Sequence, residues 1–165
     1  DLAAVNRWLR ARGDVAPERI AVIGGSCGGY MVLAALTLDP DLWAAGCDIV
    51  GIANFRPFLE RTAPYRRALR EAEYGALATD GALLDRISPL HRVDQIRAPL
   101  FVIHGVNDPR VPVQEAEQIV DALRARHQRV EYIRFDNEGH GIFRRENKVR
   151  AYGALVAFFD EVLGR

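Results

Sequence analysis

Apolar residues follow two patterns along the chain, helical stripes and short unbroken runs. Residues 1–12 carry apolar positions at helical spacing and predict an amphipathic helix. The unbroken apolar run at 20–23 is typical of a strand covered on both faces, and the next run predicts a helix that ends at Leu38. Residues 44–50 predict a second buried strand. This order of helix, strand, helix and strand favours a parallel sheet with crossover helices.

The second half of the chain repeats this alternation. Residues 100–103 predict a third strand and residues 113–126 a helix. Residues 130–135 alternate apolar and polar positions and predict a fourth strand near an edge of the sheet, and residues 146–163 predict a closing helix. The apolar face predicted for that helix comprises Val149, Leu155, Val156, Phe159 and Val162.

Residues 51–90 interrupt the alternation and are rich in arginine and aromatic residues. Residues 68–72 and 82–87 predict helical pieces. We expect this helical excursion to pass over the carboxyl ends of the strands, where open α/β sheets bind ligands. A surface hairpin with no role in binding is the alternative.

Composition limits the classes of partner. The 165 residues are 49% hydrophobic and 27% charged, with a formal net charge of zero, so nothing predicts a general attraction to nucleic acid or to acidic membranes. Cys27 and Cys47 are too few for a disulfide framework and favour a reducing compartment, hence a cytoplasmic location. No run approaches the ~20 apolar residues of a membrane span, and no signal peptide is visible.

The turn between the first strand and its helix carries candidate chemistry. Residues 24–28 (GGSCG) fit G-x-S-x-G, the nucleophile elbow, in which a serine on a sharp turn exposes its hydroxyl. Gly24 and Gly28 are expected to remove side chains that would collide where strand and helix pass closely. The N–H of Cys27, at the helix start, is a candidate oxyanion donor. Glycine-rich turns also bind phosphate, but neither the dinucleotide nor the P-loop motif is met.

A second register of the same motif is open. Residues 25–29 fit G-x-C-x-G, which would make Cys27 the nucleophile, and a cysteine at a helix start is reactive. We favour Ser26, because the paired glycines of such elbows begin two residues after the nucleophile, and Gly28 and Gly29 do so only for Ser26.

The chain also offers a base and an acid in the order found in α/β-hydrolases. Ser26 follows the first predicted strand, Asp108 the third and His140 the fourth, so all three lie at the same rim of the sheet. His104 is interpreted as a packed residue supporting the loop of Asp108, and Asp136 and Glu138 as turn residues. The four histidines show no metal-ligand spacing, and we predict no metal and no cofactor.

Six short stretches, spread over nearly the whole chain, carry a family resemblance: PERI (17–20), GGSCGGY (24–30), ISPL (87–90), APL (98–100), HGVNDPRVP (104–112) and EGHG (138–141). With these motifs the chain resembles the catalytic domain of the prolyl oligopeptidase family, most closely its acylaminoacyl-peptidase-like members. Cys27 departs from the pattern, since these enzymes usually carry tyrosine there, but only its backbone N–H is needed for the oxyanion.

The resemblance implies further site residues. Arg110 matches the arginine that holds a substrate carbonyl next to the scissile residue, and Val111 and Val50 match walls of the pocket for the residue before the cut. Aromatic residues of the excursion would complete that pocket. The candidates are Phe55, Phe58 and Tyr65.

The resemblance also implies that residues 1–165 are a partial catalytic domain, the carboxyl-terminal portion of an α/β-hydrolase fold with a mostly parallel sheet flanked by helices. The family's first strands, the loop giving the second oxyanion donor, and the β-propeller are absent from this chain. The expected partners are that missing amino-terminal part or, through the open sheet edge or an adjoining apolar face, a second copy of the chain. We expect little turnover from the chain alone.

The function implied is a serine hydrolase that cleaves short peptides or acyl-peptides through an acyl-enzyme. Two alternatives stay open: a carboxylesterase using the same three residues, and a catalytically inactive piece of a longer enzyme.

Overall fold

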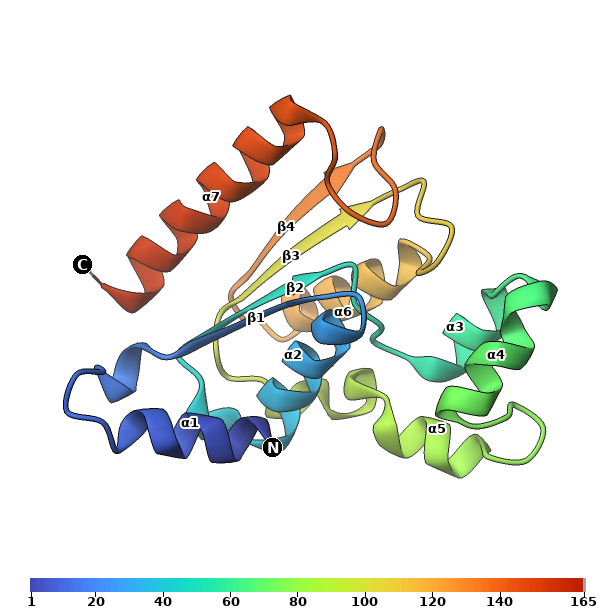
Figure 1. The fold of residues 1–165 in the computed structure, drawn as a ribbon, viewed down its shortest axis with the longest axis horizontal. Coiled ribbons are helices and arrows are strands. Elements are labelled where there is room, and N and C mark those ends of the chain that lie inside the picture. The colour runs from blue at the N-terminus through green and yellow to red at the C-terminus, as the bar shows by residue number, and fades with distance from the viewer. Residues whose placement is uncertain (165) are drawn as a thin grey trace.

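Four strands form one fully parallel sheet in the computed structural model, which describes residues 1–164 (Figure 1). Their order across the sheet is their order along the chain. This confirms the predicted α/β architecture and places the fourth strand at an edge. The strands are β1 (Ala21–Gly25), β2 (Ala45–Ile49), β3 (Leu100–Gly105) and β4 (Val130–Phe135).

Helices cover the two faces unequally. One face packs against α1, α2 and α6, and α7 lies alone on the other (Figure 1). As predicted, α6 buries Ala116, Ile119 and Val120 against the sheet. The helices of the layers are α1 (Leu2–Arg10), α2 (Cys27–Leu38), α6 (Gln114–Ala125) and α7 (Arg145–Leu163).

The excursion is more helical than the sequence predicts. Its helices are α3 (Phe55–Arg61), α4 (Pro64–Tyr74) and α5 (Gly81–Ile87), followed by the 3₁₀ helix η3 (Pro89–Gln95). The predicted piece at 82–87 agrees with α5, and the piece at 68–72 is only the middle of α4. Helix α3 was not predicted, because its apolar residues pack into a separate small core under the excursion rather than on the sheet.

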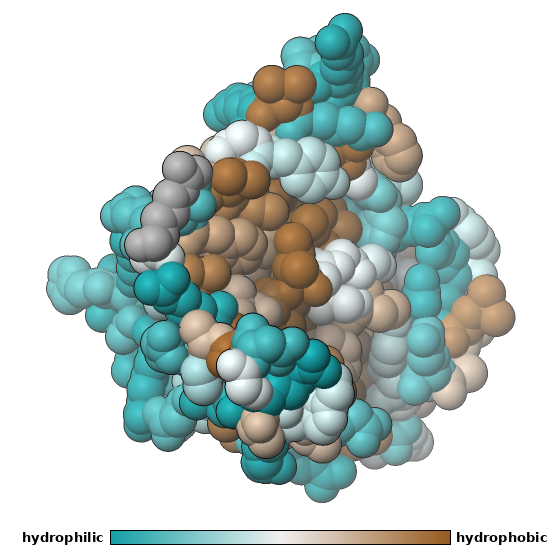
Figure 2. Space-filling model, turned by 60° about the vertical axis from the view of Figure 1, so that its left-hand side comes forward, coloured by the Kyte–Doolittle hydropathy of each residue, from teal (hydrophilic) through white to brown (hydrophobic). Residues whose placement is uncertain are grey.

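One face of β1 is uncovered, so the prediction of a strand covered on both faces is wrong. Ile23 is 55% exposed because the core under α7 extends over β2 to β4 and on β1 includes Ala21 but not Ile23. The apolar face predicted for the closing helix is also partly wrong: Leu155 is buried, but Val149 and Val156 are exposed beside Tyr152. Hydrophobic surface gathers in the middle of this side of the molecule, within a rim of hydrophilic side chains (Figure 2).

The close contact of strand and helix at the elbow involves Gly24 and Gly29, whereas Gly24 and Gly28 were predicted. A Cβ on Gly24 would overlap the backbone carbonyl of Gly28, and a Cβ on Gly29 would overlap the Asp48 carboxylate. A Cβ on Gly28 would meet nothing within 4 Å. The close approach of strand and helix therefore requires glycine at 24 and 29, and Gly28 contributes its carbonyl to the contact.

Within residues 1–164 no helix has the length and apolar content needed to cross a membrane.

We predict opposite effects for two alanine substitutions in the elbow. Gly24→Ala should destabilise the fold by about 1–3 kcal/mol, because strand and helix must move apart to admit the Cβ. Gly28→Ala lies in the first turn of α2 with open space around it and should be neutral or stabilising by up to about 1 kcal/mol. Thermal unfolding of both variants checks this, and equal losses would contradict the contact described.

Candidate active site

Ser26 lies in the turn that joins β1 to α2, with its backbone in an unusual conformation. Its φ is 57°, in the left-handed region that residues other than glycine rarely adopt. The N–H of Ser26 donates to the carbonyl of Ile49 at the end of β2 (2.8 Å). The turn is therefore tied to the neighbouring strand, and Ser26 is held where β1 ends and α2 begins.

The loops after β3 and β4 bring two side chains to this serine. His140 Nε2 lies 2.9 Å from Ser26 Oγ, and His140 Nδ1 lies 2.7 Å from Asp108 Oδ2. His140 lies 32 positions after Asp108 and 114 positions after Ser26 in the chain. The structure thus joins the three residues singled out from the sequence into one continuous series of hydrogen bonds, the arrangement that activates a serine hydroxyl as a nucleophile.

Asp108 is held in its charged form. Burial disfavours the charge, but hydrogen bonds from His140 and from the backbone N–H groups of Val111 and Arg110 outweigh burial and lower the pKa of the carboxyl group. Asp108 Oδ1 accepts the bonds from Arg110 (2.8 Å) and Val111 (3.0 Å), which leaves Oδ2 for the imidazole. A carboxylate fixed in this way orients the imidazole and favours its Nδ1–H tautomer.

His104 supports the loop of Asp108, as interpreted from the sequence. Its side chain is fully buried at the end of β3, and its Nε2–H donates to the carbonyl of Val111 (2.9 Å). Burial lowers the pKa of His104, so the imidazole is held neutral. Val111 is therefore fixed from both ends, by Asp108 through its N–H and by His104 through its carbonyl.

Glu138 holds the loop of His140 and is more than the turn residue predicted. Its buried carboxylate accepts the backbone N–H groups of Phe143 (3.1 Å) and Arg144 (2.9 Å), and Asn147 donates to it from α7 (2.8 Å). Desolvation acts against the charge, but these hydrogen bonds lower the pKa of Glu138. Its position two residues before His140 was the only signal in the sequence.

Cys27 is the first residue of α2, where N–H groups have no partners within the helix. Its side chain is exposed, and Sγ lies 3.6 Å from the hydroxyl of Tyr74 on α4. The excursion therefore closes over the site at this point. Cys27 and Cys47 are both free thiols.

An aromatic cluster adjoins Cys27 through Tyr74. Phe55 packs edge-on against Tyr30 (ring centroids 5.0 Å apart) and lies 4.9 Å from the ring of Tyr74, while Phe58 lies 6.2 Å from the same ring. Tyr65 takes no part, because it lies on the outer side of α4 and is 79% exposed. Tyr74, which was not singled out from the sequence, belongs to the aromatic cluster instead.

The three other residues predicted to contact substrate, Val111, Val50 and Arg110, differ in burial and in whether they join this cluster. Val111 is buried and packs into the cluster with Phe55 and Phe58. Val50 is buried next to Ile49 with a φ of 52°, a strained conformation for a β-branched residue, and lies outside the cluster. The side chain of Arg110 is exposed.

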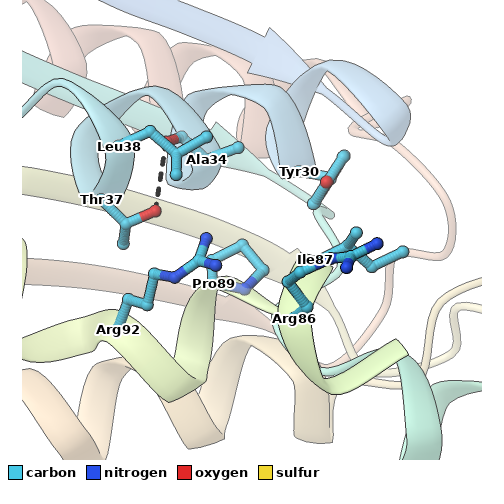
Figure 3. A pocket seen from close by; sticks show the side chains of 8 residues that line it. All are labelled: Tyr30, Ala34, Thr37, Leu38, Arg86, Ile87, Pro89 and Arg92. Carbon is cyan, nitrogen blue, oxygen red and sulfur yellow. Dashed lines mark hydrogen bonds between the residues drawn. The ribbon is translucent and has the colours of Figure 1, made fainter. Parts of the chain in front are cut away.

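A hollow of about 180 Å³ lies between α2 and the segment from α5 to η3 and contains none of the three hydrogen-bonded site residues. Arg86 and Arg92 line one side of it and Thr37 the other (Figure 3). Tyr30 links it to the aromatic cluster, since its ring touches both. The part of the chain that the structure describes holds no group of three or more His, Cys, Asp or Glu side chains arranged to bind a metal.

The sequence matches the model of the prolyl oligopeptidase family over residues 1–165. The chain belongs to this family. Dipeptidyl aminopeptidase BIII of Pseudoxanthomonas mexicana is 39% identical over 170 residues, which cover 99% of this chain and 24% of that relative.

Solved structures of the prolyl oligopeptidase family extend the comparison. A puromycin-hydrolysing peptidase of Mycobacterium tuberculosis superposes with a TM-score of 0.93 at 31% identity, over 99% of this chain and 25% of the other. The acylaminoacyl peptidase of Pyrococcus horikoshii gives a TM-score of 0.89 at 26% identity, over 99% and 27%. The chain thus spans about a quarter of the length of these proteins and is similar to the carboxyl-terminal part of their α/β-hydrolase domains.

Two further carboxylates are buried, and neither was singled out as a site residue from the sequence. Asp48 on β2 is 1% exposed, and Glu115 in the first turn of α6 is fully buried. Desolvation raises the pKa of each to about 7. Both titrate close to neutral pH, far above the range of an exposed carboxylate.

Asp48→Asn should change the pH dependence of stability. The carboxyl group has a pKa of about 7 when folded and 3.8 when exposed, so the folded state holds the proton more tightly. The contribution of Asp48 to the wild-type free energy of unfolding should therefore fall as the pH rises from about 4 to about 7, by at most about 1.4 kcal/mol per unit. Asp48→Asn should remove this contribution and make the profile less steep, while the similar contribution of Glu115 remains. Urea unfolding at several pH values checks it, with Asp121→Asn on the exposed side of α6 as control. Parallel profiles for wild type and Asp48→Asn would contradict the assignment.

Proposed function

We propose that this chain carries the catalytic residues of a serine peptidase that cleaves short peptides or acyl-peptides through an acyl-enzyme. Ser26 is the nucleophile, His140 the general base and acid, and Asp108 the residue that orients His140. The observation that carries the proposal is the pair of hydrogen bonds at His140, whose Nε2 accepts from Ser26 Oγ (2.9 Å) and whose Nδ1–H donates to Asp108 Oδ2 (2.7 Å).

In the first half of the reaction, Ser26 Oγ attacks the scissile carbonyl carbon while its proton passes to His140 Nε2. The N–H of Cys27 donates to the oxyanion that forms. His140 then gives its proton to the leaving amine, the C–N bond breaks, and the acyl group stays on Ser26 as an ester. In the second half, water attacks this ester with His140 as the base, which releases the acid and restores the serine.

Contacts on the acyl side of the substrate are proposed from the family resemblance together with the aromatic cluster. We propose that Val50 and Val111 contact the residue before the cut, together with the aromatic cluster of Phe55, Phe58 and Tyr74. Arg110, whose backbone N–H binds Asp108, would present its exposed guanidinium to a substrate carbonyl. The names of the relatives, a dipeptidyl aminopeptidase and an acylaminoacyl peptidase, support substrates of this size.

We propose that this activity requires a longer protein, of about the length of these relatives, of which residues 1–165 are one part. We propose that residues 1–165 form a partial α/β-hydrolase domain, and that an amino-terminal part pairs with the free edge of β1, covers Ile23 and gives the second oxyanion donor. The uncovered hydrophobic surface in Figure 2 and the fourfold greater length of the relatives support this.

Substitutions of the three hydrogen-bonded residues test the mechanism. In the full-length protein, Ser26→Ala should abolish labelling by a fluorophosphonate, and Asp108→Asn should lower kcat about 10⁴-fold, because the imidazole loses its orienting partner. Cys27→Ala is the matched control and should keep most activity, since the proposed role uses only its backbone N–H. Loss of labelling in Cys27→Ala but not in Ser26→Ala would make Cys27 the nucleophile.

Paired substrates separate peptidase from esterase activity. A peptide and an ester with the same acyl part should both be hydrolysed, with comparable kcat/KM values once the leaving group is allowed for. Hydrolysis of the ester alone would overturn the peptidase assignment and favour a carboxylesterase.

Ile23→Arg tests the proposed contact with the amino-terminal part. The substitution should destabilise the full-length protein by about 2 kcal/mol or more, because a buried apolar contact is replaced by a charge. It should hardly affect residues 1–165 alone, where Ile23 is 55% exposed. Leu69→Arg on the exposed side of α4 is the control. Light scattering tests the alternative that a second copy of the chain covers this surface. A dimer of residues 1–165 that dissociates in Ile23→Arg would support the second copy.

A further inference from the structure

The buried carboxylates Asp48 and Glu115 have no ion-pair partner between residues 1 and 164. Arg61 on α3 attracts Glu115 through space but does not touch it. Burying a carboxylate costs free energy unless hydrogen bonds offset the loss of water, so the partners of these two groups show what they hold in place.

Both carboxylates accept hydrogen bonds from the same short segment of backbone. Asp48 Oδ1 accepts the N–H of Gly51 (2.8 Å). Glu115 Oε2 accepts the N–H groups of Ala53 (3.1 Å) and Asn54 (2.8 Å), while its Oε1 is held by Gln118 (3.1 Å). In the segment 50–54, named here the β2–α3 loop, the N–H of Val50 still donates to the carbonyl of Ile103 on β3 (2.9 Å). The N–H groups of Gly51, Ala53 and Asn54, further along the loop, donate to the two carboxylates instead.

The β2–α3 loop connects the nucleophile turn to the aromatic cluster. It begins next to Ile49, whose carbonyl accepts the N–H of Ser26. It leads into Phe55, which packs on Tyr74 beside Cys27. A shift of this loop would therefore disturb both the anchor of the nucleophile turn and the aromatic cluster.

Packing around Asp48 leaves the loop little freedom. The Asp48 carboxylate fills the space that a Cβ on Gly29 or on Gly51 would need. It therefore lies wedged between the first turn of α2 and the β2–α3 loop. The strained Val50, with a φ of 52°, lies between Ile49 and Gly51, the residue that the Asp48 carboxylate contacts.

We propose that Asp48 and Glu115 are positioning residues that together fix the shape of the β2–α3 loop, so that Val50 and Phe55 stay beside Ser26 and receive the acyl part of the substrate. This inference rests on the proposed peptidase function. It assigns to the two carboxylates an effect on substrate fit and none on proton transfer, because neither reaches Ser26, His140 or Asp108.

Three substitutions of Glu115 in the full-length protein test the inference. Glu115→Gln keeps an oxygen at the same reach and should leave KM for a peptide p-nitroanilide near the wild-type value. Glu115→Asp keeps the charge but is one methylene too short, and Glu115→Ala lacks the acceptor. Both should raise KM about tenfold with little change in kcat, because the loop N–H groups lose their partner. Glu117→Ala, in the same turn of α6, is the matched control.

A second substrate separates loop positioning from general damage. p-Nitrophenyl acetate has an acyl group too small to reach the loop, so its hydrolysis should change less than twofold in every variant. The reverse order, with Glu115→Asp normal and Glu115→Gln impaired, would overturn the inference, because charge rather than reach would then matter. Equal losses with both substrates would also overturn it.

Hydrogen exchange measures the loop without relying on activity. Amides of residues 51–54 should exchange at least tenfold faster in Glu115→Asp and Asp48→Ala than in wild type, with rates elsewhere unchanged. Unchanged exchange in the loop would refute the inference whatever the kinetics show. If wild type hydrolyses no substrate but the loop exchanges as expected, the peptidase proposal fails and the structural assignment of the two carboxylates stands.

Discussion

The contact between β1 and α2 at the Ser26 turn is the constraint on which the site depends. The chain reverses so tightly that the Cα of Gly24 faces the carbonyl of Gly28, with no room for a side chain. Ser26 takes a positive φ as a result, and its N–H is anchored to β2 through Ile49. The hydroxyl therefore has a fixed place relative to the sheet, and the loops of His140 and Asp108 reach that place because parallel strands end at a common rim.

Carboxylates that bind backbone N–H groups recur around this rim. Asp108 fixes its own loop, Glu138 fixes the loop of His140, and Asp48 and Glu115 share the β2–α3 loop. The first residue after each of β1, β2 and β3 donates its N–H to the neighbouring strand, and side-chain carboxylates accept N–H groups further along these loops. Hydrogen bonds outweigh desolvation at Asp108 and Glu138 and lower their pKa, while deeper burial outweighs them at Asp48 and Glu115 and raises theirs.

The sequence predicted those parts of the site that follow from local pattern. The elbow motif, the chain order of Ser26, Asp108 and His140, and the strand before each loop were all readable, because an α/β sheet converts chain order into spatial order. Tyr74 was not separable from Tyr65, since both are aromatic residues of the excursion and only the way α4 packs decides which one faces Cys27. The roles of Glu138 and Glu115 could not be predicted either. Both carboxylates bind backbone N–H groups, which every residue except proline carries, so the sequence does not show which ones they bind.

By itself the sequence determined the α/β alternation, the four strands and the residues able to form a nucleophile, a base and an acid. Those features depend on periodicity and on residue chemistry, which are properties of the chain. Tertiary structure alone decided that α7 leaves Ile23 on β1 uncovered, that Gly29 rather than Gly28 must lack a side chain, and that two buried carboxylates hold the loop beside Ser26. Each of these depends on the distance between segments far apart in the chain, and such distances are fixed only when the elements pack together.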